Sequence, residues 1–237
     1  MELGSALFQL PKREVHVWQT DFERPISSVH DLLDRQEQER AARFKVEAPR
    51  KQFIVSHAFL RLALESYLGI AARDIRFRIA AYGKPELDAD TDLRFNLSHT
   101  EGTAVLAVAR ERQVGVDVER IRGNFNPLEL ADRFFSSPEA SWLRSQPRAQ
   151  QFPSFFACWT AKEAYIKACG NGLSMPLDQF SIIPRPANQR LKIEFLDKAE
   201  PPAEWTMWAL DLGPDLRAAL AAEGRELTVN LRHWSWP

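Results

Sequence analysis

The chain has 237 residues, of which 45% are hydrophobic and 27% are charged, a composition typical of a globular protein with enough chain for one large domain or two small ones. Its formal net charge of −1 argues against a protein that binds nucleic acid or anionic membranes through overall charge. No window reaches about 18 consecutive apolar residues, and the N-terminus lacks the basic and apolar parts of a signal peptide. We therefore expect a cytoplasmic protein without a membrane span.

Patterns in the first half of the chain predict a strand, two helices and then a run of strands. Ser27 or Ser28 is a suitable N-cap for the first helix, and Pro49 and Gly69 mark the ends of the second. The expected elements are a strand at 14–20, helices at 27–44 and 50–67, and strands at 74–81, 93–98 and 103–109.

The second half repeats this order of a strand, helices and further strands, although the two halves share little local sequence identity. The expected elements are a strand at 114–121, helices at 127–135, 138–142 and 155–173, and strands at 180–183, 191–195, 205–212, 216–221 and 227–234. The doubled order predicts an α+β protein with two similar lobes, an N-terminal lobe at 1–112 and a C-terminal lobe at 113–237. Clefts between such lobes are common ligand sites, so we expect a site there.

The helix expected at 155–173 is apolar on nearly every side, which indicates a buried helix. It nevertheless carries Lys162, Glu163 and Lys167. Charges inside a dry helix are unfavourable unless they are paired or bind something charged. Glu163 and Lys167 lie four positions apart, so an ordinary ion pair on the helix is one explanation. A ligand of the cleft is the other.

Two carboxylates of the strand at 114–121, Asp117 and Glu119, point to the same face because alternate residues of a strand share a face. Neighbouring carboxylates repel each other unless water or a cation lies between them. A solvated acidic edge strand would explain the pair. If Glu163 also approaches them, three carboxylates surround one site, and magnesium prefers such oxygen ligands together with phosphate.

Several basic and polar residues are candidates for binding phosphate. Ser98 and His99 end a strand and could donate hydrogen bonds to phosphate, or could simply be a polar strand end. Lys84 lies at a turn, where a solvated lysine would be ordinary. The chain has no glycine-rich phosphate loop, so side chains would have to hold a nucleotide. The segment 35–78, with ten Lys or Arg and five Asp or Glu, offers Arg43, Arg50, Lys51 and Arg61.

Four short motifs, in this order, resemble those of the Sfp-type 4′-phosphopantetheinyl transferases. The motifs are Tyr82-Gly83-Lys84-Pro85, Phe95-Asn96-Leu97-Ser98-His99, Gly115-Val116-Asp117-Val118-Glu119 and Trp159-Thr160-Ala161-Lys162-Glu163-Ala164-Tyr165-Ile166-Lys167, followed by Gly170-Asn171-Gly172-Leu173. Each motif is weak alone, but four in register are a strong indication. The segment from Arg43 to Arg61 also resembles the N-terminal helices of that family. His57 departs from the pattern, because many members have Arg there.

The resemblance implies a fold of two similar α+β lobes related by a pseudo-twofold, with the active site in the cleft between them. It implies transfer of the 4′-phosphopantetheine arm of coenzyme A to a serine of an apo acyl or peptidyl carrier protein, with release of adenosine 3′,5′-bisphosphate. Magnesium is the implied cofactor, held by Asp117, Glu119 and Glu163. Glu163 is also the implied base and Lys167 the implied charge-stabilising group, whereas Lys84, Ser98 and His99 are implied contacts of coenzyme A.

Two other functions use similar residues. A metal-dependent nuclease or phosphodiesterase also needs clustered carboxylates and a lysine, but the absence of a strongly basic surface argues against it. A carrier-binding scaffold with a relic site is the third hypothesis, and the intact acidic set argues against that. We therefore expect a monomeric enzyme without nucleic-acid or membrane partners.

Overall fold

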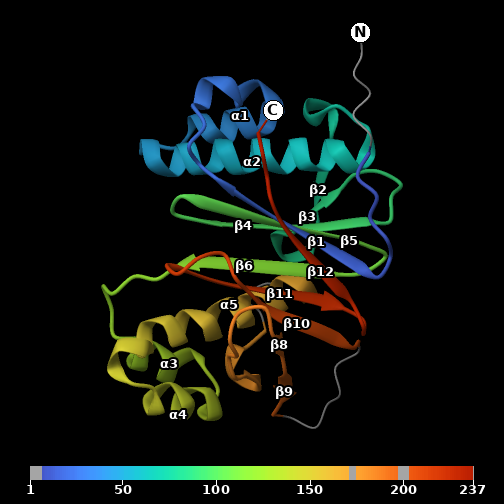
Figure 1. Cartoon of the computed structure of the whole chain (residues 1–237). Coiled ribbons are helices and arrows are strands. Elements are labelled where there is room, and N and C mark those ends of the chain that lie inside the picture. The colour runs from blue at the N-terminus through green and yellow to red at the C-terminus, as the bar shows by residue number, and fades with distance from the viewer. Residues whose placement is uncertain (1–6, 171–174, 197–202, 237) are drawn as a thin grey trace.

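Two four-stranded sheets face each other in the middle of the molecule, and helices cover their outer faces (Figure 1). The computed structural model describes residues 7–170, 175–196 and 203–236. The strands of the first sheet lie in the order β12 (Thr228–His233), β1 (Glu14–Asp21), β5 (Thr103–Arg110), β4 (Leu93–Thr100). Those of the second lie in the order β6 (Val114–Arg120), β11 (Leu216–Glu223), β10 (Trp205–Leu210), β8 (Arg190–Leu191).

One long helix covers each sheet. Helix α2 (Glu47–Leu68) packs against the first sheet and α5 (Gln151–Cys169) against the second. Both end at a glycine in the left-handed region, Gly69 with φ 68° and Gly170 with φ 71°, a conformation that glycine adopts readily. The other helices are α1 (Arg35–Ala42), α3 (Pro127–Phe134) and α4 (Ser137–Ser145), and the remaining strands form the pairs β2 (Phe77–Ile79) with β3 (Pro85–Leu87) and β7 (Phe180–Ile182) with β9 (Ile193–Phe195).

A hydrophobic core lies between the two sheets. It joins buried residues of the first sheet, such as Val17 and Val105, to Val116, Val118 and Leu220 of the second. The alternation expected in these strands is what makes this core, since every second side chain of a strand points to the same face. The two sheets therefore pack as one body.

The two lobes have the same connectivity. In each, a strand leads to a long helix and then to an antiparallel pair whose second member pairs with the first strand, as β1 does with β5 and β6 with β11. The prediction of an α+β fold with two similar lobes is confirmed. The link between the sheets is short, since β5 ends at Arg110 and β6 begins at Val114.

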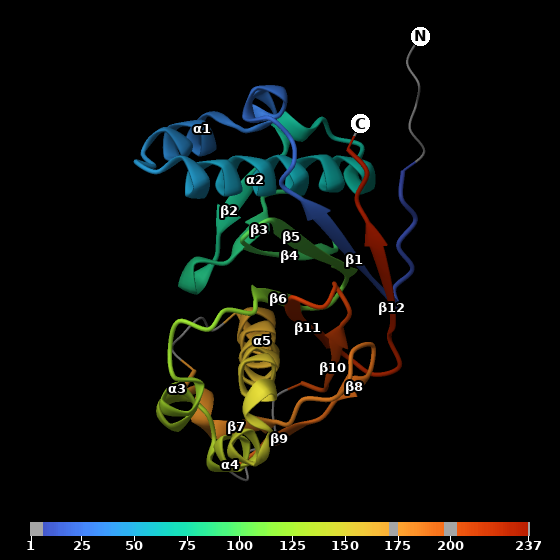
Figure 2. The same ribbon diagram turned by 60° about the vertical axis from the view of Figure 1, so that its left-hand side comes forward.

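The C-terminal strand is where the predicted lobe at 113–237 differs from the structure. Strand β12 leaves the second lobe and pairs in parallel with β1 of the first sheet, Glu14 opposite Thr228 (Figure 2). Behind it, Trp234 packs edge to face on the rings of Trp18 and Phe59. An unpaired edge at β1 would leave backbone groups without partners, and β12 supplies them.

Some local expectations were also wrong. The helix expected at 27–44 begins only at Arg35, because Asp34 and Glu37 form a capping box there, and 3₁₀ turns at Ile26–Ser28 and His30–Leu32 precede it. The strand expected at 74–81 shrinks to β2, and that at 191–195 divides between β8 and β9. Residues 171–173 of the expected last helix lie outside the described residues. Among the described helices, none is long and apolar enough to cross a membrane.

Candidate active site

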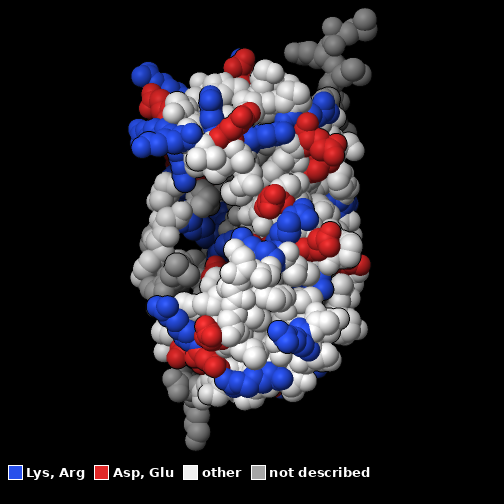
Figure 3. All heavy atoms as spheres, turned by 90° about the vertical axis from the view of Figure 1, so that its left-hand side faces the viewer, with Lys and Arg blue, Asp and Glu red and all other residues white. Residues whose placement is uncertain are grey.

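A cavity of about 790 Å³ lies between the lobes. Its walls come from β4, β6, α3, α5 and residues 175–178. Figure 3 looks onto this side of the molecule, where the surface is hollowed between the lobes and basic side chains gather on the first lobe above the hollow. Of the predicted site residues, the structure brings together Ser98, His99, Asp117, Glu119, Glu163 and Lys167 in this cavity.

Gly115 is the reason that the carboxylates of β6 and the charges of α5 meet. A Cβ atom at Gly115 would lie 2.2 Å from the Ala164 carbonyl oxygen and 2.3 Å from the Ala168 nitrogen. Only a residue without a side chain allows the strand to approach the helix backbone so closely. This contact sets Asp117 and Glu119 beside Glu163 and Lys167.

Asp117 is the centre of a small polar network. Its Oδ1 lies 2.6 Å from Lys167 Nζ and accepts a hydrogen bond of 2.8 Å from Ser98 Oγ. The ammonium of Lys167 also donates to Ser98 Oγ at 3.1 Å. Lys167 is thus paired across the helix–strand contact with Asp117, and the intrahelical pair with Glu163 is not the arrangement of this structure. The network holds a cation and an anion at the cavity wall.

The carboxylates of Glu119 and Glu163 are both harder to ionise than ordinary ones. Burial, followed by the charge of Asp117, raises the pKa of Glu119 and of Glu163. Glu163 Oε1 is buried without a hydrogen-bond partner. Each of these features would be relieved by a cation between the carboxylates.

Magnesium fits this donor set by its chemistry, because it prefers a few carboxylate oxygens together with phosphate. Protein ligands alone do not complete a metal site, because no group of three His, Cys, Asp or Glu among the described residues is placed to hold one metal ion. Lys167 instead neutralises Asp117, while Glu163 keeps an oxygen without a partner. The residues fit a cation that arrives with a phosphate ligand better than one bound by protein alone.

His99 stands at the exposed side of the cavity next to the buried Ser98. Desolvation by the cavity walls lowers the pKa of His99, and electrostatic interactions with His57 and Lys167 lower it further. His57 itself is fixed by a 2.7 Å hydrogen bond between its Nδ1 and Glu37 Oε1 and by stacking on Phe53. Both imidazoles therefore stand on the first-lobe side of the site.

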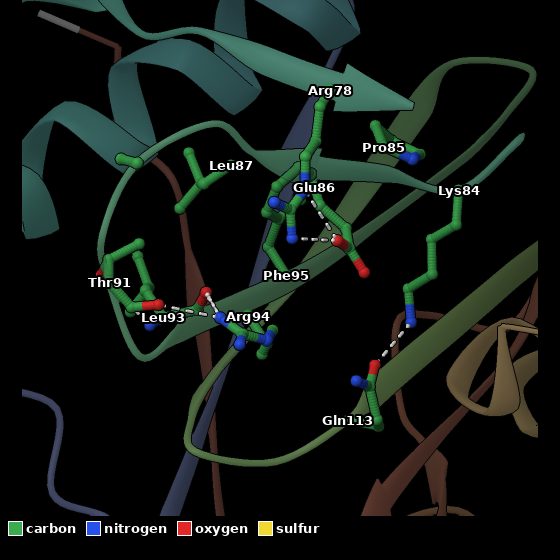
Figure 4. Close-up of a pocket in the computed structure, with 11 residues that line it drawn as sticks. Arg78, Lys84, Pro85, Glu86, Leu87, Thr91, Leu93, Arg94, Phe95 and Gln113 are labelled. Carbon is green, nitrogen blue, oxygen red and sulfur yellow. Dashed lines mark hydrogen bonds and ion pairs between the residues drawn. The ribbon is translucent and has the colours of Figure 1, made fainter. Parts of the chain in front are cut away.

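Lys84 is half-buried and reaches Gln113 at the link between the lobes (Figure 4). Its Nζ donates to Gln113 Oε1 at 3.3 Å, to the Val114 carbonyl at 3.2 Å and to the Ala168 carbonyl at 3.4 Å. Burial lowers its pKa to about 8. It also lines a neighbouring cavity of about 250 Å³ that reaches Glu163 and Lys167. A phosphate bound by Lys84 would replace bonds that the ammonium already makes.

The other predicted phosphate contacts lie apart from the cavity walls. Arg43 and Arg50 are exposed and Lys51 is half-buried near the N-terminal end of α2, and none of them lines the two cavities described above. Arg61 is fully buried, where it binds Asp34 and Glu37 at 2.6 Å each. Its guanidinium is therefore a structural group of the first lobe, and the sequence-based suggestion that it could hold a nucleotide is not supported.

Lys162 points away from the cavity into the second lobe. Its Nζ lies 2.8 Å from Glu139 Oε2, and both side chains are 0% exposed. The ammonium also donates to the carbonyls of Leu177 and Phe180 at 2.6 Å each, and Glu139 Oε1 accepts from the Ile182 amide at 2.7 Å. Lys162 thus fixes the segment that forms one wall of the cavity.

Sequence reasoning missed several residues of the site. Arg133, Phe134 and Trp159 line the cavity, and the rings of Phe134 and Trp159 meet edge to face. Thr100 was also missed, although its place two residues after Ser98 puts both on one face of β4. Alternation along the strand was the pattern that could have revealed it.

Comparison with protein families gives two adjoining matches. The model of the 4′-phosphopantetheinyl transferase superfamily matches residues 113–221. A model described as the N-terminal part of 4′-phosphopantetheinyl transferase matches residues 9–111.

Two named relatives are similar to most of the chain. The chain is 36% identical over 219 residues to the 4′-phosphopantetheinyl transferase HetI of Nostoc sp., covering 89% of this chain and 88% of that protein. It is 31% identical over 165 residues to the 4′-phosphopantetheinyl transferase Sfp of Bacillus subtilis, covering 68% and 72%. A solved holo-(acyl-carrier-protein) synthase from Bacillus anthracis, in complex with CoA (3′,5′-ADP), is 22% identical and covers 40% of this chain and 93% of its own, with a TM-score of 0.33.

Proposed function

Because the chain belongs to the 4′-phosphopantetheinyl transferase superfamily, its reaction is transfer of phosphopantetheine from coenzyme A to a carrier protein, and we propose that the inter-lobe cavity is where this happens, with magnesium. The observation that carries the proposal is that Asp117, Glu119, Glu163 and Lys167 line one cavity, in which Lys167 neutralises only Asp117 and Glu163 keeps an oxygen without a partner. A pyrophosphate and its metal ion supply the charges that this set lacks.

The reaction joins the hydroxyl oxygen of the carrier serine to the phosphorus next to the pantetheine. The bridging P–O bond of the pyrophosphate breaks, adenosine 3′,5′-bisphosphate leaves with the electron pair, and the serine proton must be taken up. Such a transfer depends on positioning and charge neutralisation more than on covalent help from the enzyme. The nucleophile comes from the carrier, so the chain needs none of its own.

Glu163 is suited to accept the serine proton. Its Oε1 has no hydrogen-bond partner, so this oxygen can accept the proton directly or through water, as a general base must. Lys167 stabilises negative charge on the pyrophosphate. Magnesium, held by Asp117, Glu119 and Glu163, would supply Lewis-acid stabilisation of the phosphate oxygens.

Coenzyme A is the substrate, and we assign its phosphates and adenosine to the first lobe. Ser98 and His99 on β4 and Lys84 beside the joint between the lobes are the proposed contacts near the pyrophosphate. Arg43, Arg50 and Lys51 are proposed for the more distant phosphate, since a side chain outside the cavity can reach only the exposed end of the ligand. Binding as a monomer is supported by the fact that both lobes of one chain line the cavity. The cytoplasmic location and the absence of nucleic-acid and membrane partners stay predictions.

The proposed function is tested by mixing the protein with coenzyme A, magnesium and an apo carrier protein and recording the mass of the carrier. We expect a gain of one phosphopantetheine that disappears when the metal is chelated. Carriers of fatty acid, polyketide, nonribosomal peptide and lysine pathways should each be tried. No gain on any of them would refute the proposal, and a gain that survives chelation would remove magnesium from it.

Glu163→Gln tests the assigned base. We expect the transfer rate to fall by about 10²-fold or more, because the amide neither accepts the proton nor carries charge. The unfolding midpoint should stay the same or rise, since a buried carboxylate without a full set of partners is removed. Glu101→Gln, at an exposed position, is the matched control and should transfer like the wild type. A fully active Glu163→Gln enzyme would exclude Glu163 as the base.

A further inference from the structure

Strand β6 is the edge of the second sheet, yet its outward backbone is hydrogen-bonded. The acceptors are side chains of β4 in the other lobe. The three bonds run from Val116 N to Asn96 Oδ1 at 2.9 Å, from Val118 N to Ser98 Oγ at 3.4 Å and from Arg120 N to Thr100 Oγ1 at 3.3 Å. Alternate side chains of β4 thus supply the acceptors that a neighbouring strand would otherwise supply to β6.

The three bonds form in a row because the groups on both strands recur at every second residue. Outward amides recur at every second residue of β6, and same-face side chains recur at every second residue of β4. Asn96, Ser98 and Thr100 are 6%, 5% and 8% exposed, so these acceptors lie away from water. A buried amide without an acceptor is unfavourable, and these three residues provide the acceptors.

The same hydroxyls reach the carboxylates of β6. Ser98 Oγ donates to Asp117 Oδ1 at 2.8 Å, and Thr100 Oγ1 donates to Glu119 Oε2 at 3.3 Å. A hydroxyl has one proton to donate, so accepting from the amide of Arg120 directs the proton of Thr100 to Glu119. The Ser98 hydroxyl therefore binds the Val118 amide and the Asp117 carboxylate, and the Thr100 hydroxyl binds the Arg120 amide and the Glu119 carboxylate.

We infer that Thr100 is a positioning residue for Glu119: its hydroxyl, locked by the Arg120 amide, orients the carboxylate that we assign to the divalent cation. The inference rests on the proposed function, since it assigns Glu119 to the metal. Ser98 performs the same task for Asp117 but also contacts Lys167. Thr100 can be changed without touching a group that we assign to substrate.

Thr100→Val removes the hydroxyl and keeps the shape, and Thr100→Ser keeps the hydroxyl. The matched control is Thr103→Val, which removes a buried bond of 2.7 Å that the Thr103 hydroxyl donates to the Thr20 carbonyl, in the same sheet, and not to a carboxylate. Binding of Mn²⁺ in the presence of coenzyme A is measured by the paramagnetic signal of the free ion. The magnesium concentration for half-maximal rate and the rate at saturating magnesium are measured in parallel.

We expect Thr100→Val to bind Mn²⁺ about tenfold more weakly, as loss of a hydrogen bond to a charged group predicts, and to need correspondingly more magnesium. Its rate at saturating magnesium should stay within about twofold of wild type, because metal excess restores occupancy. Thr100→Ser and Thr103→Val should bind Mn²⁺ like the wild type. If Thr100→Val does not fold, Thr100→Ala is measured in the same way.

Unchanged Mn²⁺ binding in Thr100→Val, or equal weakening in Thr103→Val, would overturn the inference while leaving the proposed function in place. If Glu163→Gln binds Mn²⁺ as tightly as the wild type, the metal site of the proposed function is overturned, and the inference with it. Hydrogen exchange gives a further check: the Arg120 amide should exchange faster in Thr100→Val and the Val116 amide should not. Equal protection of the Arg120 amide in both proteins would contradict the bond on which the inference rests.

Discussion

At Gly115 a single missing side chain decides how close β6 lies to α5. The two backbones approach until a Cβ atom would sit 2.2 Å from the Ala164 carbonyl oxygen. Real atoms do not come so close, and the obstacle is helix backbone, which cannot rotate aside as a side chain can. The separation of Asp117 from Lys167 and Glu163 depends on this contact.

Gly115→Ala should therefore push β6 away from α5. We expect a loss of about 3 kcal/mol of unfolding free energy, the upper end for overpacking, together with a loss of transfer activity in the fraction that still folds. Urea unfolding and the carrier-mass assay measure the two effects. Gly123→Ala is the control, because a Cβ there would meet only the Phe152 ring at 3.7 Å, and its stability should be close to wild type. Equal stability of Gly115→Ala would show that the strand can move without consequence.

The sequence was sufficient to predict some site residues and not others, for a physical reason. Asp117 and Glu119 share a face because of strand alternation, which is local, and motif spacing placed Glu163 and Lys167 nearby. The partner of Lys167 was not predictable, because it is set by the meeting of β6 with α5. The oxygens around Lys84 belong to residues 113–114 and to Ala168, which approach Lys84 only in the fold.

At the scale of elements, α5 shows how one helix divides its charges between two environments. Glu163 and Lys167 line the cavity, whereas Lys162 is buried against Glu139 of α4 and the backbone of residues 177–180. The sequence revealed that a buried helix carried unexpected charges, but the partner of Lys162 lies on another helix. Its identity follows only from the packing of α4 beside α5.

For the buried pair of Lys162 and Glu139, we expect that removing one charge destabilises the protein more than removing both. Lys162→Met leaves Glu139 buried and charged without its partner, and should cost about 3–5 kcal/mol of unfolding free energy. Adding Glu139→Gln removes that charge, so the double variant should lose less than the sum of the single variants. Lys192→Met, which breaks the exposed pair with Glu194, should change stability by less than about 1 kcal/mol. Additive losses in urea unfolding of the single and double variants would contradict the pairing.

For the whole molecule, the crossing of β12 to the first sheet joins the two halves of the chain. Local patterns correctly predicted a strand at 227–234, where β12 spans Thr228–His233, but a strand pattern does not state which edge it pairs with. The lobe boundary was therefore predictable only where connections are short, as between β5 and β6. The bonds between β4 and β6 give a second tie between the lobes.

Because of these ties, the lobes should unfold together. We expect one urea transition, coincident by tryptophan fluorescence and far-ultraviolet circular dichroism, as for a single cooperative unit. Trp234→Ala removes the ring that packs on Trp18 and Phe59, and should lower the free energy of unfolding by about 3–5 kcal/mol while keeping one transition. Leu231→Ala, at a position of β12 that is 38% exposed, should have a much smaller effect. Two separate transitions, with only the first-lobe one shifted by Trp234→Ala, would mean that the lobes fold independently and that β12 does not couple them.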